Sequence, residues 1–273
     1  MKDIIHFSHA NGFPASTYRT VFAELADDYQ IRSIQRYGHD SRFPVTQDWP
    51  HLVDQLVEDM GRYRQAPQYT DGGHPKVWLV GHSLGGYLSL MAALKRPQWV
   101  KGVVMLDSPI IAGWRSGVLR VTQWTGLDER LSPAAATKKR RTHWASRDEA
   151  WRHFRAKPAF ARWDERMLAD YIDFGIPQTL PDGTRTLAFD RHVEYLIYRT
   201  LPHTLGARLA HGAPVPVGFV AGTHSTEVRH VGLCMTRRVA GEHLEWIEGS
   251  HLFPMERPIE TARAIRRLLR SIG

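Results

Sequence analysis

Short apolar runs alternate with helical patterns along most of this chain, and this alternation constrains the fold more than any other feature. It predicts an α/β fold in which a mostly parallel sheet is covered by helices on both faces. The expected strands are Ile4–Ser8, Ile31–Gln35, Val77–Val80, Gly102–Leu106, Val215–Ala221 and Leu244–Ile247. The expected helices, from apolar residues at helical spacing, include Tyr18–Leu25, Leu52–Tyr63, Leu84–Leu94 and Pro258–Leu269.

The alternation stops after Leu106 and resumes near residue 214. Residues 108–214 contain amphipathic helical stretches and no continuous apolar strand, and Pro181-Asp-Gly183 is typical of a tight turn. The segment is also rich in tryptophan, at positions 114, 124, 144, 151 and 163. We expect residues 1–107 and 215–273 to form one core, and 108–214 to form a helical cap over the carboxyl edge of its sheet.

Composition excludes several classes of protein. The 273 residues contain no apolar run long enough for a membrane span, and the N-terminus lacks the features of a signal peptide, so we expect a cytoplasmic protein. One cysteine, Cys234, cannot form an intrachain disulfide. The net charge of +8 is scattered except at 138–141, which we interpret as a solvated helix face, and no nucleic-acid-binding signature accompanies it.

The sharpest local motif is Gly81-His-Ser83-Leu-Gly85, a G-x-S-x-G pattern. An apolar strand runs directly into it and a helical stretch runs directly out, which is the context that a nucleophile elbow requires. The chain folds back tightly there, so the residues two before and two after the serine must be small. The sequence therefore predicts Ser83 as a nucleophile raised above the sheet edge.

A serine hydroxyl needs a base within hydrogen-bond reach, and His251 has the right position among fifteen histidines. It follows the last predicted strand and precedes the last helix, so its loop should lie at the same carboxyl edge as Ser83. An acyl-transfer site also needs two oxyanion donors. One is expected to be the Leu84 N–H, and the other should come from the loop Ser8–Pro14, where we interpret His9 as structural.

Four stretches together resemble the α/β-hydrolase superfamily, in particular its serine esterases and lipases: Ser8–Pro14, Arg36–Pro44, Val80–Gly86 and Gly249–His251. The first is similar to the family's oxyanion loop, and the match places the second donor at the Asn11 N–H. The second resembles a G-H-G-x-S turn, which implies structural roles for His39 and Ser41. The two antiparallel strands that usually open this fold have no counterpart here. We therefore expect six strands, with Ile31–Gln35 either exposed at an edge or covered by a partner in a homodimer.

The catalytic acid departs from the family pattern. Family members usually carry it as G-x-x-D after the strand that follows the cap, whereas this chain has Gly222-Thr-His-Ser225. Glu227 lies two residues further on, and Asp107 ends the strand before the cap, where some members of the superfamily place the acid. We favour Asp107 over Glu227, with the same role for either: to orient the imidazole and stabilise its charged form.

The resemblance implies a serine hydrolase that cleaves a carboxylic ester of a small molecule, with no cofactor and no metal ion. The tryptophans of 108–214 favour an apolar or aromatic acyl pocket, or they simply pack the cap. A lyase, a thioesterase or a cofactor-free oxygenase on the same scaffold stays open as an alternative. A non-catalytic ligand-binding protein of the same fold is the remaining rival.

Overall fold

A computed structural model describes residues 2–64, 75–113, 137 and 140–273. Six parallel strands form one sheet in the order β2-β1-β3-β4-β7-β8, which confirms the predicted fold class. The strands are β1 (Asp3–Ser8), β2 (Tyr29–Ser33), β3 (Val77–His82), β4 (Val100–Leu106), β7 (Val217–Gly222) and β8 (Leu244–Ile247). The edge strand β2 begins and ends two residues before its predicted place, and none of its residues is fully buried.

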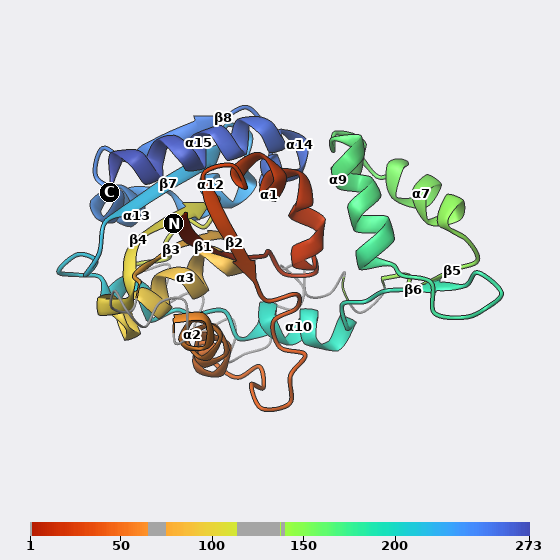
Figure 1. Cartoon of the computed structure of the whole chain (residues 1–273), viewed down its shortest axis with the longest axis horizontal. Helices are drawn as coiled ribbons and strands as arrows, with labels where there is room; N and C mark the ends of the chain where they lie inside the picture. Colours follow the sequence, from red (N-terminus) through yellow and green to blue (C-terminus); the bar gives the residue numbers. More distant parts are fainter. Residues whose placement is uncertain (1, 65–74, 114–136, 138–139) are drawn as a thin grey trace.

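Helices cover both faces of this sheet, as Figure 1 shows. One face carries α1 (Arg19–Leu25) and α15 (Pro258–Ser271), and the other carries α2 (Pro50–Arg64) and α3 (Leu84–Lys95). Side chains that alternate along the strands enter two separate apolar clusters. In β3, for example, Leu79 packs with α2 and α3, whereas its neighbour Val80 packs with α1 and α15.

The remaining short helices lie in the connections of the core. The 3₁₀ turns are η1 (Ala15–Tyr18), before α1, and η3 (Pro97–Trp99), after α3. The connections beside β8 contain α12 (Thr226–Val231), α13 (Cys234–Ala240) and α14 (Phe253–Glu256). Among the described residues, no helix has the length and apolarity needed to cross a membrane.

The chain between β4 and β7, which we call the insertion, is mainly helical where it is described. Figure 1 shows α7, α9, β5 and β6 at one end of the molecule, beyond α1. The elements are β5 (His143–Trp144), α7 (Arg147–Arg155), α8 (Pro158–Ala161), α9 (Glu165–Asp170), the π-helical turn η4 (Tyr171–Gly175), β6 (Arg185–Thr186), α10 (Arg191–Arg199) and α11 (Leu205–Arg208). β5 and β6 pair in antiparallel fashion, and Gly183 has a φ of +92° in the turn predicted at 181–183.

Tryptophan side chains of the insertion pack its interior. Trp144 and Trp163 are 1 % and 2 % exposed, and both belong to the apolar cluster on the α1 side of the sheet. Trp151 is partly buried against the same cluster, while Trp114 and Trp124 lie outside the described residues. Trp144 and Trp163 therefore support the packing interpretation and not the aromatic-pocket interpretation.

Candidate active site

Ser83 stands between the end of β3 and the start of α3, in a strained backbone conformation with φ 54° and ψ −113°. A non-glycine residue at positive φ is uncommon and persists only where its surroundings enforce it. Here the enforcing feature is the close approach of the flanking glycines. A Cβ atom at Gly81 would lie 2.1 Å from the Gly85 carbonyl oxygen, and one at Gly85 would lie 1.9 Å from the Ser8 carbonyl oxygen. The turn can therefore form only with glycine at both positions.

Asp107 follows β4 directly and is 1 % exposed, with a φ of +45°. Its backbone N–H donates to the Val220 carbonyl oxygen at 2.8 Å. Its carboxylate accepts from Gly222 N–H at Oδ1 (2.7 Å) and from the Ser225 hydroxyl at Oδ2. Both carboxylate oxygens of this buried group are thus satisfied, as burial of a charge requires.

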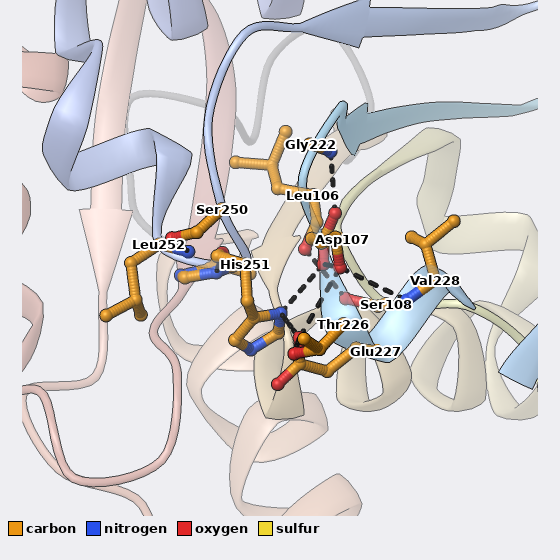
Figure 2. A network of polar contacts seen from close by, with 12 residues as sticks. Leu106, Asp107, Ser108, Gly222, Thr226, Glu227, Val228, Ser250, His251 and Leu252 are labelled. Atoms are coloured by element: carbon orange, nitrogen blue, oxygen red, sulfur yellow. Dashed lines mark hydrogen bonds and ion pairs between the residues drawn. The ribbon is translucent and has the colours of Figure 1, made fainter. Parts of the chain in front are cut away.

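His251 lies in the loop after β8, and its ring points toward Asp107 and Glu227 in Figure 2. Its Nδ1 is 2.8 Å from Asp107 Oδ2 and 3.7 Å from Glu227 Oε2. Burial by itself lowers the pKa of His251, but the bond to Asp107 and the charge of Glu227 outweigh burial, and the pKa is raised above its usual value. The geometry therefore favours a protonated Nδ1 that donates to Asp107.

Glu227 belongs to α12 and approaches the same imidazole from the solvent side, with 41 % of its side chain exposed. Thr226 Oγ1 donates to its Oε2 at 2.8 Å. Burial raises the pKa of Glu227, but the charge of His251 and the hydrogen bonds outweigh burial and lower it. Of the two carboxylates considered in the sequence, Asp107 makes the shorter and more buried contact with His251.

Ser225 occupies the position where the family pattern has an aspartate, and it contributes to the site in another way. Its hydroxyl donates to Asp107 Oδ2 and accepts from the Val228 N–H at 3.1 Å, and this second bond caps the N-terminus of α12. The sequence pattern did not predict this role for Ser225. The available signal was a serine followed by a short helical stretch, which is typical of an N-cap.

The loop after β1 and the start of α3 lie beside this group. A chain of hydrogen bonds joins the loop after β1, the end of β3 and the loop of His251. Ala10 N–H donates to Tyr18 Oη at 3.2 Å. Tyr18 O–H donates to His82 Nδ1 at 2.7 Å, and His82 Nε2–H donates to the His251 carbonyl oxygen at 2.9 Å. Burial holds the pKa of His82 well below its usual range, so this imidazole stays neutral. The residue before the nucleophile thus ties the His251 loop to the elbow, a role that the G-x-S-x-G pattern did not reveal.

The residues predicted to supply the oxyanion donors lie at the start of α3 and in the loop after β1. Leu84 is the first residue of α3, and N–H groups in a first helical turn have no partner within the helix. Asn11 is 5 % exposed, and its side-chain amide donates to the Glu194 carbonyl oxygen at 3.0 Å. The loop after β1 turns at Gly12, next to Asn11, where φ is +81°.

The histidines predicted to be structural make structural contacts. The buried His9 donates through Nδ1 to the Ala10 carbonyl oxygen and accepts from Tyr37 N–H at Nε2, and burial lowers its pKa to about 4. His39 accepts from the Asp190 N–H at 2.9 Å and so joins the core to the insertion. Ser41 is exposed.

The prediction of a solvated face at 138–141 is wrong for Arg140, whereas Lys138 and Lys139 lie outside the described residues. The Arg140 side chain is 15 % exposed and forms an ion pair with Glu194 at 2.9 Å. A local charge pattern could not reveal this pair because its partner lies 54 residues away.

Asp107, Glu227 and His251 could also hold a metal ion, because one ligand atom from each lies within 4.8 Å of the others. Asp107, however, already accepts from Gly222, Ser225 and His251. Its oxygens would have to give up these donors to bind a cation. The arrangement therefore favours a hydrogen-bonded pair of His251 and Asp107 over a metal centre.

Comparison with known proteins gives one family. Residues 7–264 match the sequence model described as "Alpha/beta hydrolase family". No curated protein sequence matches the chain significantly.

Solved structures of similar fold differ in the activities that their names print. E-2-(acetamidomethylene)succinate hydrolase is 18 % identical, with a TM-score of 0.76 over 99 % of this chain and 92 % of its own. The thioesterase domain from the curacin biosynthetic pathway is 19 % identical, with a TM-score of 0.70 over 97 % and 91 %. The enol-lactonase from Burkholderia xenovorans LB400 is 16 % identical, with a TM-score of 0.62 over 99 % and 92 %. At these identities the likeness shows a shared fold.

Proposed function

Because the chain belongs to the α/β-hydrolase family, we propose that it is a serine hydrolase that cleaves a carboxylic ester or a related acyl bond. In this proposal Ser83 is the nucleophile, His251 is the general base and Asp107 is the acid that orients His251. The N–H groups of Asn11 and Leu84 stabilise the oxyanion.

One observation carries the proposal: His251 Nδ1 lies 2.8 Å from Asp107 Oδ2, at the sheet edge where the strained Ser83 also stands. With Nδ1 bonded to the carboxylate, the other ring nitrogen, Nε2, serves as the base. Parallel pairing of β3 with β4 and of β4 with β7 supports this assignment, since it brings the ends of these strands to one edge.

The proposed reaction proceeds in two halves. Ser83 Oγ attacks the substrate carbonyl carbon while His251 Nε2 takes the hydroxyl proton, and the oxyanion receives hydrogen bonds from the two backbone amides. Collapse of this intermediate breaks the bond to the leaving group, which takes the proton from His251. Water then attacks the acyl-enzyme with His251 again as base, and the carboxylic acid and free Ser83 are released.

Glu227 has a supporting role in this scheme. Its longer contact with His251 and its exposure suit a charge that raises the pKa of the imidazole, rather than the group that fixes its tautomer. Its contribution to the rate is therefore proposed to be smaller than that of Asp107, because an exposed charge is screened by solvent.

The substrate is proposed to be a small carboxylic ester, with thioesters and lactones as the related acyl donors to compare. The names of the similar structures include a thioesterase and an enol-lactonase, and this is why both classes belong in the comparison. A preference for an apolar or aromatic acyl group stays a prediction, and the packing of Trp144 and Trp163 inside the insertion gives it no support.

Intact mass after treatment with a fluorophosphonate tests the proposal, with Ser83→Ala as the comparison. We expect one stoichiometric adduct on the native protein and none on the variant. A panel of p-nitrophenyl esters, thioesters and lactones then gives the acyl class. A folded native protein that forms no adduct and turns over none of these substrates would contradict the proposal and favour a ligand-binding role.

A further inference from the structure

Three consecutive residues of the loop that follows β1 are in contact with the insertion. The Asn11 side chain donates to the carbonyl oxygen of Glu194. Gly12 lies so close to Glu194 that a Cβ atom there would be 2.7 Å from its carboxylate oxygen Oε1. The centroid of the Phe13 ring lies 5.5 Å from the ring centroids of both Trp163 and Tyr171. We call residues 10–13 the oxyanion loop.

Two separate parts of the insertion provide these contacts, and Arg140 connects them. Its Nη1 donates to both carboxylate oxygens of Glu194, at 3.0 and 2.9 Å. Its Nη2 donates to the Tyr171 hydroxyl. Glu194 belongs to α10 and Tyr171 begins η4, so one guanidinium group holds together the elements on two sides of the oxyanion loop.

The surroundings make this connection rigid. The side chains of Arg140 and Glu194 are 15 % and 7 % exposed, and Tyr171 is fully buried. Charge-assisted hydrogen bonds in such a setting are shorter and stronger than neutral ones, and solvent screens them less. Tyr171 is further fixed by ring contacts with Phe154 and Phe160.

We propose that Arg140 is a positioning residue: by joining Glu194 to Tyr171 it fixes the oxyanion loop and thereby sets the position of the Asn11 N–H. This inference rests on the proposed acyl-transfer function. Arg140 does not act as a substrate anchor in this scheme, since three of its hydrogen bonds are made to Glu194 and Tyr171. Its effect reaches the reaction through the loop, which is why it is expected in kcat and not in KM.

The central variant is Glu194→Gln, which keeps the backbone carbonyl that binds Asn11 but removes the charge that binds Arg140. Arg140→Lys is the second variant, because an ammonium group cannot bridge Glu194 and Tyr171 as the planar guanidinium does. The matched control is Asp173→Asn, which breaks the exposed pair with Arg147 in the same turn as Tyr171 and leaves the oxyanion loop untouched.

The first measurement compares p-nitrophenyl acetate with the corresponding thionoester, whose sulfur is a poor partner for oxyanion donors. We expect Glu194→Gln and Arg140→Lys to lose about tenfold or more in kcat for the ester, with KM changed less than about threefold. The preference for the ester over the thionoester should shrink as well. Asp173→Asn should stay within about twofold of the native protein.

The second measurement is amide hydrogen exchange of the peptide that contains residues 9–14, which does not depend on turnover. Exchange should be faster in both variants and unchanged in Asp173→Asn. Folded variants with native kcat, or with reduced kcat but native ester preference and native exchange at 9–14, would overturn the inference. Failure of the proposed function is a distinct result: Ser83 of the native protein then takes no fluorophosphonate, while exchange still reports whether Arg140 orders the loop.

Discussion

The two sides of the candidate site are built in different ways. On the acid side, Asp107 is held by the ends of neighbouring strands, through the Val220 carbonyl and the Gly222 N–H. On the oxyanion side, the loop at Gly12 is held by side chains of the insertion, above all Glu194 and Arg140. The sheet therefore determines one half of the geometry, whereas the other half depends on a segment that is remote in the sequence.

The largest expected effect tests the acid side. Asp107→Asn keeps the shape of the side chain but removes the charge that fixes the His251 tautomer, so kcat should fall about 10³- to 10⁴-fold. Steady-state kinetics with an activated ester measure this loss. The control is Asp59→Asn, which changes the Asp59–His6 contact (3.1 Å) elsewhere in the core and should leave kcat unchanged. A loss from Asp107→Asn of less than tenfold would remove Asp107 from the triad.

The next effect tests the oxyanion side. Gly12→Ala places a Cβ atom against a Glu194 carboxylate that Arg140 prevents from moving, in a backbone with φ of +81°. We expect kcat to fall about tenfold or more and the melting temperature to drop. Gly212→Ala is the matched control, because its φ is +95° and no atom lies within 4 Å of the added Cβ. It measures the cost of the backbone conformation alone, so equal effects of both variants on kcat would contradict this account.

A smaller effect is expected at Ser225, which links the acid to α12. Ser225→Ala removes the hydroxyl that donates to Asp107 and caps the helix, so we expect about 1–2 kcal/mol of lost stability. Chemical denaturation measures the loss, and kcat should fall a few-fold. Ser146→Ala provides the comparison, since Ser146 caps α7 without touching the site. Ser146→Ala should lose similar stability and keep the native kcat. An equal loss of kcat in Ser146→Ala would contradict the proposed effect of Ser225 on Asp107.

The smallest effect is a displacement of the pH profile. Glu227 raises the pKa of His251, and the base must be neutral to accept the Ser83 proton. Glu227→Gln removes this charge, so the pKa of His251 falls and the acidic limb of kcat/KM moves to lower pH. The plateau at higher pH should change less than about tenfold. Glu245→Gln, which affects an exposed pair with Arg267, should leave the limb in place, and a shift to higher pH in Glu227→Gln would reverse our assignment.

The sequence predicted the sheet and the strand-end residues because these depend on short-range patterns. Runs such as Val77–Val80 identify buried strands, and the glycines beside Ser83 identify the tight turn that raises it. The predicted position of the edge strand β2 is two residues too far along the chain. Its side chains are less buried than those of a central strand, so they give a weaker apolar pattern. The acid stayed ambiguous between Asp107 and Glu227 because both lie after strands at the same edge.

The contacts within the insertion could not be predicted in this way. The charge cluster predicts a solvated face for Arg140, but its guanidinium group binds Glu194 and Tyr171, which lie 54 and 31 residues further on. Which side chains pair over such distances in the sequence is decided by how the folded chain packs. Local patterns in a single sequence do not predict these pairs. The same holds for His82, whose role depends on Tyr18 and on the backbone of His251.

The place where the insertion leaves the sheet has a consequence for how such a protein can diverge. The insertion begins just after β4 and returns just before β7, and these strands are hydrogen-bonded neighbours. Because the two strands are parallel, the insertion leaves at the carboxyl edge of the sheet and returns at the opposite edge. The pairing of β4 with β7 fixes both of these ends, so the length and sequence between them can change without disturbing the strand order. If the insertion positions the oxyanion loop as proposed, a graft of a different insertion would alter the catalytic rate together with the substrate. On this proposal, specificity and turnover would change together whenever the insertion is exchanged.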